Sequence, residues 1–227
     1  MTRGYEQYCP IAKGSEIFAE RWTPLIVRNL YLGCHTFSEL QQGCPRMSGS
    51  LLAHRLRSLE RDGVIERAPH PKGRGSLYYL TPAGQELVDV VKSLGTWGAR
   101  WLDLGPRDYD PSVVLWAWAK FIDLDRLPAH RVVVRFDLSD QAGKSFWMVL
   151  DRQAAELCAL DPGFDEDLVV TTDSVTLTEF HRGRLPWAVA VGSGRLIVDG
   201  PPDLARALPT WGGLSYFADV RPTRRPA

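Results

Sequence analysis

The sequence predicts an α+β protein of two parts: a helical N-terminal domain that carries a two-stranded hairpin, and a smaller C-terminal domain with a mostly antiparallel sheet. Two observations support this prediction. Residues 36–81 read as a short helix, a tight turn, a longer helix and two short strands. After the glycine- and proline-bearing stretch 104–111, apolar and polar residues alternate with the period of two that is typical of strands. We therefore expect domains at 1–103 and 112–227, joined by a linker at 104–111.

Two helices are expected before residue 36. Pro10 suits the first turn of a helix that runs to about Phe18, because its missing N–H is not needed there. Thr23 is the expected cap of the next helix, which Pro24 starts. Cys9 would then lie beside a helix N-terminus, where the macrodipole favours a thiolate. The alternative is a partly buried thiol with no chemistry.

The longer helix of the 36–81 stretch has two different faces. Ser48 is its expected N-cap, and Gly63 suits the residue after its end, which often needs a positive φ. Leu52, Leu56 and Leu59 recur at the spacing of one buried helical face. The opposite face is polar and cationic, and it consists of Ser50, His54, Arg57 and Arg61.

The hairpin after this helix has a basic tip. Its strands are expected at 64–65 and 77–80, and the segment between them contains Lys72 and Arg74 among glycines that permit a sharp turn. A helix-turn-helix followed by such a hairpin is a winged helix. The second helix of this arrangement can enter a major groove about 12 Å wide while the wing meets phosphate. The alternative is a small helical domain whose charged face is only solvated.

The next helix is expected to form a dimer. Thr81-Pro82 starts it, and it runs to about Leu102. Its apolar surface is too wide for one small domain to cover, so the helix is either buried by the C-terminal half or paired with its copy. We favour a homodimer through 82–102, because a two-fold protein reads two half-sites about one DNA turn apart. The stripe expected at the interface consists of Val90, Leu94, Trp97 and Trp101.

The C-terminal half is expected to begin with an apolar helix at 112–122 and to continue mainly as strands. Strands that form a hairpin first and helices that come later are typical of α+β domains. The expected strands are 131–138, 145–151, 156–160, 168–172 and 194–199. The expected short helices are 174–181, 186–191 and 203–208.

Composition limits the function classes. The formal net charge is zero, but residues 1–103 carry +3 and residues 104–227 carry −3. There is no run of about 18 apolar residues and no charged-then-apolar leader, so we expect a cytoplasmic protein with no membrane partner. The cysteines lack CxxC spacing, which argues against structural zinc and favours reduced thiols. They are Cys9, Cys34, Cys44 and Cys158.

No motif for catalysis, a cofactor or a metal is present. The Gly192-Ser193-Gly194 run lacks the last glycine of a dinucleotide fingerprint, and it precedes a strand instead of a helix. The five histidines have no ligand spacing, there is no GxSxG elbow, and the acidic run 165–167 is better explained as a solvated loop than as a metal site. We therefore predict no cofactor, no catalytic residue and no enzyme.

Several short motifs follow one another along residues 8–103. They are Cys9-Pro10, Arg21-Trp22-Thr23, Leu25-Ile26-Val27, Phe37-Ser38-Glu39-Leu40, Ser48, Leu51-Leu52, Leu56-Arg57-Ser58-Leu59-Glu60, Asp62-Gly63-Val64-Ile65-Glu66-Arg67 and Tyr79-Leu80-Thr81-Pro82-Ala83-Gly84. In this order and spacing they resemble the motifs of the HxlR-type regulators, a bacterial branch of the winged-helix family. The resemblance implies a homodimeric transcriptional regulator, often autoregulatory or acting on a neighbouring gene. Some relatives use the cysteine at the Cys9 position to sense oxidants or reactive electrophiles.

Two kinds of DNA contact are expected from this domain. Ser50, His54 and Arg57 are the candidates for contact with base edges. The candidates for phosphate contact, which positions a protein without specifying sequence, are Arg46, Ser48, Lys72 and Arg74. The chain departs from the family at Gly49 and Ser50, where larger polar residues are usual. Its operator sequence therefore cannot be transferred from a relative.

Four further motifs lie within residues 110–210. They are Phe146-Trp147-Met148-Val149, Asp167-Leu168-Val169-Val170-Thr171, Gly183-Arg184-Leu185 and Gly194-Arg195-Leu196-Ile197-Val198-Asp199-Gly200. With these motifs the segment resembles the sterol-carrier-protein-like domain. The resemblance implies an apolar tunnel for a hydrophobic small molecule; the alternative is an ordinary core with no cavity. The residues expected around such a ligand are Trp116, Phe121, Trp147, Phe180, Trp187 and Trp211.

The function expected from the whole sequence is that of an HxlR-type, DNA-binding transcriptional regulator, acting as a homodimer on a pseudo-palindromic operator. A hydrophobic ligand in the C-terminal domain or thiol chemistry at Cys9 would modulate it. One alternative is a hydrophobic-ligand carrier with a vestigial winged-helix domain, and another is an enzyme that works in the C-terminal cavity. The basic wing favours the regulator over the carrier, and the lack of a nucleophile with its base argues against the enzyme.

Overall fold

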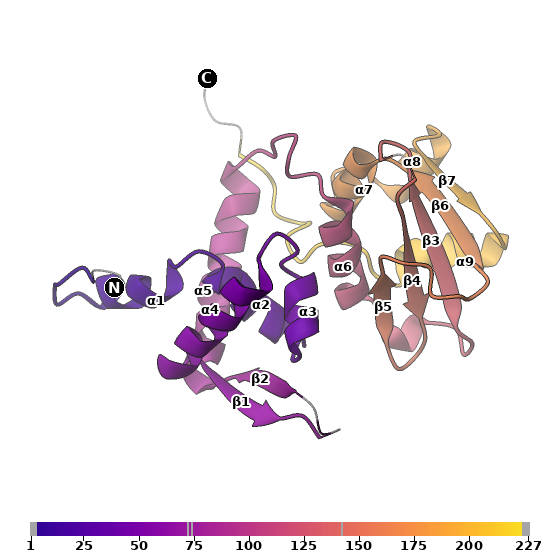
Figure 1. Ribbon diagram of the computed structural model, residues 1–227. Helices are drawn as coiled ribbons and strands as arrows, with labels where there is room; N and C mark the ends of the chain where they lie inside the picture. Colours follow the sequence, from indigo (N-terminus) through magenta and orange to yellow (C-terminus); the bar gives the residue numbers. More distant parts are fainter. Residues whose placement is uncertain (1–3, 72, 74, 142, 224–227) are drawn as a thin grey trace. The chain divides into compact units, whose positions relative to one another are not determined.

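The structure is a computed structural model that describes residues 4–71, 73, 75–141 and 143–223. The chain forms two compact units, Met1–Thr96 and Trp97–Ala227 (Figure 1). The boundary between the units falls within one long helix, α5 (Pro82–Trp101). In the described part of the chain, no helix is both long and apolar enough to cross a membrane.

The first unit is a helix-turn-helix with a wing (Figure 1). The wing strands pair in antiparallel fashion with Ile65 opposite Leu80, and a single bridge joins Thr36 to Leu77 beside them. The elements in order are α1 (Pro10–Phe18), α2 (Thr23–Tyr31), α3 (Phe37–Gln42), α4 (Gly49–Arg61), β1 (Ile65–Pro69), β2 (Ser76–Leu80) and the first part of α5.

Local signals place the two helices of the helix-turn-helix. At α3, the Thr36 hydroxyl accepts from the Glu39 N–H at 3.3 Å, and the Glu39 carboxylate accepts from the Thr36 N–H at 2.8 Å. This reciprocal pair is a capping box. At α4, the Ser48 hydroxyl accepts from the Leu51 N–H at 3.3 Å, and Gly63 follows the helix with φ of +69°. The predicted start and end of α4 are therefore confirmed.

Burial follows the predicted faces of α4. Leu52, Leu56 and Leu59 are at most 2% exposed, whereas the opposite face is open to solvent. These leucines belong to the buried apolar set of the unit, whose members in α2 and α3 are Ile26, Val27, Leu30 and Leu40.

The expected cap of α2 is wrong by one residue. A turn in which the Thr23 N–H donates to the Glu20 carbonyl at 3.0 Å precedes the helix, and Trp22 occupies the N-cap position with φ of 80°. Thr23 is then the first helical residue, and it is buried. Pro24 still fits at the second position, because that N–H also has no intrahelical partner.

The second unit contains a five-stranded sheet in the order β5-β4-β3-β6-β7 (Figure 1). Three of its four strand pairs are antiparallel, as expected, and β3 pairs with β6 in parallel. The strands are β3 (Val132–Leu138), β4 (Ser145–Leu150), β5 (Ala155–Cys158), β6 (Leu168–Thr172) and β7 (Leu196–Asp199). The helices are α6 (Pro111–Phe121), η1 (Leu124–Arg126), α7 (Ser174–His181), α8 (Trp187–Gly192), α9 (Pro202–Ala207) and η2 (Leu208–Thr210).

Helices α6 and α7 pack on one face of this sheet. Alternation along β3 places Val134, Phe136 and Leu138 in the core beneath them, and Arg135 and Asp137 on the other face. Aromatic rings fill the centre of the core. The ring centroid of Trp118 lies 5.5 Å from that of Phe136, 5.2 Å from that of Phe180 and 5.8 Å from that of Trp187.

Pro111 belongs to α6 and not to the connecting stretch, which is a small correction to the expected linker. Residues 102–110 form neither helix nor strand. The Asp110 carboxylate accepts from the Ser112 N–H at 3.1 Å, so Asp110 caps α6 and Pro111 is its first residue. A proline at this position is preorganised for a helix.

Candidate nucleic-acid interface

The face of α4 that carries the predicted base-contacting residues is exposed. Ser50, His54 and Arg57 all lie on the solvent side of the helix, opposite its three buried leucines. Their spacing of four and three residues places them along one line of the helix. A helix held rigidly on one side and open on the other can be inserted into a groove without disturbing its own core.

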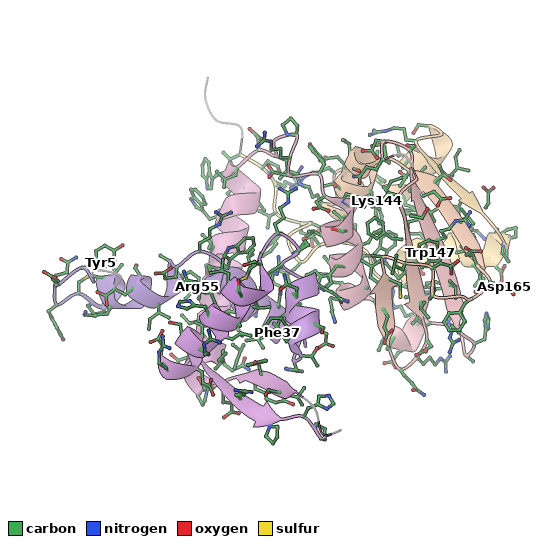
Figure 2. All side chains as sticks on the ribbon, in the orientation of Figure 1. Tyr5, Phe37, Arg55, Lys144, Trp147 and Asp165 are labelled. Carbon is green, nitrogen blue, oxygen red and sulfur yellow. The ribbon has the colours of Figure 1, made fainter. Side chains whose placement is uncertain are left out.

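Arg55 lies on the same helix (Figure 2). An ion pair fixes its side chain. Its guanidinium is 2.5 Å from the Glu20 carboxylate, and its side chain is only 18% exposed. Arg55 therefore connects α4 to the segment before α2, and Arg57 is the exposed cation of this turn of the helix.

Gly49, the first residue of α4, lies beside α3. A Cβ at Gly49 would be 3.7 Å from both Phe37 and Gln41 of α3. A side chain at this position would therefore lie against α3. Ser50 is the first exposed side chain within α4, and its hydroxyl is 3.2 Å from that of Ser48.

Two of the predicted phosphate contacts are placed by the structure. Arg46 and Ser48 are exposed in the turn before α4, and the Ser48 oxygen also serves as the helix cap. Lys72 and Arg74 lie outside the described residues. Beside them, Gly73 and Gly75 have φ of 96° and 101°, so the wing tip uses its glycines for left-handed backbone, as predicted.

A histidine that sequence reasoning missed attaches the wing to the rest of the unit. The His35 ring nitrogen Nδ1 is 2.9 Å from the Tyr78 carbonyl, and the Tyr78 N–H donates to the His35 carbonyl at 2.9 Å. The His35 ring also lies 4.6 Å from that of Tyr79, measured between centroids. The only sequence signal for this contact is the short spacing between α2 and α3, which brings His35 beside β2.

Sequence reasoning also missed a polar cluster at the turn between α3 and α4. Arg28 and Asn29 of α2 donate hydrogen bonds to carbonyl groups of this region. Burial lowers the pKa of the Arg28 guanidinium, while the nearby thiols of Cys44 and Cys34 act in the opposite direction. Burial raises the pKa of the Cys44 thiol, so Cys44 is a packing residue here and not a reactive one.

Cys9 occupies the N-cap position of α1, as predicted. Cys9 is half-buried, whereas Cys34 and Cys44 are fully buried. Burial, with Glu156 nearby, raises the pKa of the Cys158 thiol. Among the residues that the structure describes, no group of three or more His, Cys, Asp or Glu side chains could hold a metal ion.

The apolar stripe predicted along α5 is exposed. Val90, Leu94, Trp97 and Trp101 are 46%, 47%, 53% and 38% exposed. Their spacing of four, three and four residues places them along one side of the helix. Apolar side chains of this size, aligned and open to solvent, are typical of a surface that binds another protein chain.

The six residues expected around a hydrophobic ligand lie in different environments of the second unit. Phe180, Trp187 and Trp211 belong to the core of the second unit or pack against it. Trp147 lies on the opposite face of the sheet, because Phe146 and Met148 on either side of it face the core. Trp116 is buried outside this core cluster, and Phe121 is half-buried.

Trp147, which is labelled in Figure 2, is part of a polar group on that opposite face. Its indole N–H donates to the Glu166 carboxylate at 3.2 Å, and the Arg135 guanidinium donates to the same oxygen at 3.0 Å. The Trp147 hydrogen bond lowers the pKa of Glu166 most, and a backbone hydrogen bond and then the one from Arg135 lower it further. Trp147 is therefore a surface residue held by polar contacts, and the expectation that it shares an apolar site with Phe180 is wrong.

Comparison with known proteins decides the family. A family model described as HxlR-like helix-turn-helix matches residues 17–105. The HTH-type transcriptional regulator YvaP of Bacillus subtilis (strain 168) is 34% identical over 99 residues, which are 43% of this chain and 92% of that protein. The chain belongs to the HxlR-like helix-turn-helix family.

Two further proteins are similar to this HxlR-like chain. The HTH-type transcriptional regulator YtfH of Escherichia coli (strain K12) is 32% identical over 94 residues, or 41% of this chain and 75% of that protein. The reduced form of the transcriptional regulator YodB from B. subtilis has 28% identity and a TM-score of 0.37, and the match covers 44% of this chain and 99% of that one.

The HxlR-type prediction for the N-terminal part is therefore confirmed, together with its winged helix-turn-helix fold. The names of the relatives are those of regulators, which agrees with the prediction that the chain is not an enzyme. The family match ends at residue 105, so the sterol-carrier-like interpretation of the second unit stays a prediction.

Proposed function

We propose that this chain is a DNA-binding transcriptional regulator that reads its operator with α4, which we name the recognition helix. The observation that carries the proposal is the exposed line of Ser50, His54 and Arg57 on a helix whose opposite side is fully buried, in a chain of the HxlR-like family. These three side chains would meet base edges in the major groove. The phosphates would be met by Arg46, Ser48, Lys72 and Arg74.

The regulator acts as a homodimer in this proposal. The exposed stripe of Val90, Leu94, Trp97 and Trp101 supports it, since a second copy of α5 would cover the same apolar side chains. Two recognition helices related by a two-fold axis would read a pseudo-palindromic operator with half-sites about one turn, roughly 34–36 Å, apart. Residues 1–103 would thus hold both DNA binding and dimerisation.

Two inputs to the regulator are proposed. One is a hydrophobic small molecule bound by the domain at 112–227, supported by the aromatic core around Phe180, Trp187 and Trp211 and by the sterol-carrier-like motifs. The other is thiol chemistry at Cys9, supported by its half-buried place at the start of α1. A ligand changes operator affinity only if it binds the DNA-competent and incompetent dimers differently.

Selection from a randomised DNA pool tests the proposal. The purified protein should enrich a two-fold symmetric sequence, and fluorescence anisotropy should then show tighter binding to that duplex than to an unrelated duplex of equal length. The logarithm of the binding constant should fall linearly with the logarithm of salt concentration, because phosphate contacts release counterions. Failure to enrich any sequence, with no binding to a duplex of random sequence at low salt, would leave a protein with a vestigial winged helix.

A further inference from the structure

Side chains hold carbonyl groups at the end of α3 and in the turn that leads to the recognition helix. The Gly43 carbonyl accepts from Arg28 Nη2 at 2.8 Å, and the Leu40 carbonyl accepts from Asn29 Nδ2 at 3.2 Å. Gln41 Nε2 of α3 donates to the Cys44 carbonyl at 3.3 Å and also to the Met47 carbonyl. Side chains of α2 and α3 thus fix the path of the chain from the end of α3 to the start of α4.

Arg28 and Asn29 act on this turn as one unit. The Asn29 side-chain oxygen accepts from Arg28 Nε at 2.9 Å and from Arg28 Nη2 at 2.8 Å, so the guanidinium plane is fixed by two bonds to one atom. Asn29 is fully buried, and its Nδ2 also contacts the Cys44 sulfur at 3.4 Å. Both residues follow Val27, which is fully buried, so they project from a part of α2 that cannot move without disturbing the core.

A small rotation at this turn is enough to change the contact with DNA. Arg57 lies eight residues after Gly49, or about 12 Å along the helix at about 1.5 Å per residue. A tilt of about 5° at the turn would therefore move Arg57 by about 1 Å. Donor–acceptor distances of hydrogen bonds span only about 2.7–3.2 Å, so a shift of this size would break a base contact while leaving looser phosphate contacts in place.

We infer that Arg28, acting through Asn29 and the Gly43 carbonyl, is a positioning residue that sets the sequence preference of the recognition helix, an inference that rests on the proposed function. Arg28 does not itself touch DNA in this scheme. A lysine could keep the buried charge, but it lacks the planar guanidinium. In the wild type, Nε and Nη2 of this group both donate to the Asn29 side-chain oxygen, and Nη2 also donates to the Gly43 carbonyl. The charge and the geometry can therefore be separated by experiment.

The test compares Arg28→Lys with the wild type on two duplexes, one selected from a randomised pool by the wild-type protein and one unrelated. Anisotropy titrations should show affinity for the selected duplex falling about tenfold, the lower part of the range that one bidentate base contact contributes. Affinity for the unrelated duplex should stay unchanged. The matched control is Arg152→Lys, the same change at an arginine of the second unit that donates to the Leu127 carbonyl, and it should keep the ratio of the two affinities. Circular dichroism establishes that each variant is folded.

A second variant covers the case in which Arg28→Lys does not fold. Gln41→Met removes both donations to the turn and also the buried Gln41 Oε1, which has no hydrogen-bond partner among the described residues, so it is expected to fold. It should lower the affinity ratio as Arg28→Lys does. Folded variants with the wild-type ratio would overturn the positioning role and leave the proposed function intact. A wild-type protein that enriches no sequence would overturn the proposed function and this inference with it.

Discussion

Gly84 of α5 lies against the Val64 carbonyl so closely that a Cβ at position 84 would be 2.1 Å from that oxygen. The Thr81 hydroxyl, which donates to the Gly63 carbonyl at 2.6 Å and accepts from the Gly84 N–H at 3.2 Å, lies at the same junction. Residues 63–64 directly follow α4, so the Thr81-Pro82-Ala83-Gly84 motif places the start of α5 against the end of the recognition helix.

This contact predicts that Gly84→Ala destabilises the first unit. A glycine-to-alanine change inside a helix normally stabilises by about 1 kcal/mol, but here the new methyl group meets backbone, which must move. Overpacking of this kind costs about 1–3 kcal/mol. Chemical denaturation followed by circular dichroism measures the effect. Gly14→Ala in α1 is the control, since a Cβ there meets nothing within 4 Å. Equal stability of wild type and Gly84→Ala would contradict the close approach of α5.

A second prediction separates base contacts from phosphate contacts. Arg57→Ala should weaken binding to the selected operator by about 1–3 kcal/mol and relax the sequence preference. Lys72→Ala should weaken binding to all sequences and reduce the salt slope by about one unit. Anisotropy against salt concentration measures both quantities, and Arg206→Ala, an exposed arginine of the second unit, serves as the control. Identical behaviour of the Arg57 and Lys72 variants would remove the distinction between the two roles.

A third prediction concerns the dimer. Leu94→Glu would place an unpaired carboxylate in the apolar stripe of α5. A buried charge without a partner costs about 3–5 kcal/mol, here in the free energy of dimerisation. Dimer affinity should therefore fall more than about hundredfold, to a monomer at micromolar concentration in sedimentation velocity. Gln85→Glu adds the same charge on the opposite side of the helix and should leave the dimer intact. Wild-type protein that sediments as a monomer would refute the interface.

The fourth prediction concerns Cys9. Because Cys34 and Cys44 are fully buried and burial raises the pKa of Cys158, Cys9 should be the first thiol alkylated by iodoacetamide in the native protein. Peptide mapping by mass spectrometry after brief exposure gives the order. Cys9→Ser should abolish any loss of DNA binding on oxidation, whereas Cys158→Ser should not. A variant Cys9→Ser that responds to oxidants like the wild type would exclude Cys9 as the sensor.

The sequence was most informative where structure depends on near neighbours. Ser48, the leucines at 52, 56 and 59, and Gly63 determine α4 through caps and periodicity, and the structure agrees with each. The hydrogen bond from Arg28 to the Gly43 carbonyl in the turn before α4 could not be predicted, because the two residues are fifteen positions apart and no local pattern connects them. Residue type alone did not show that Trp147 faces away from Phe180, because this depends on the alternation along β4, which puts Trp147 and Phe146 on opposite faces. Composition identifies an apolar residue, but only strand register tells which face it occupies.

The last prediction concerns pH and the second unit. His181 is 8% exposed, its ring nitrogen Nδ1 is 2.5 Å from the Gly213 carbonyl, and burial lowers its pKa. In the unfolded chain this histidine titrates near its ordinary value of about 6.5, so below that pH the unfolded state binds more protons than the folded one. Stability of the unit should therefore rise with pH up to about 7 and fall on acidification, with a slope of at most about 1.4 kcal/mol per pH unit for one proton.

Urea unfolding followed by tryptophan fluorescence between pH 5.5 and 7.5 measures this slope. Ordinary carboxylates titrate below this pH range and do not contribute to it. His181→Gln keeps a donor for the Gly213 carbonyl and should flatten the dependence, whereas His130→Gln, at an exposed position of the same unit, should not. A wild-type slope in His181→Gln would assign the pH dependence to another group.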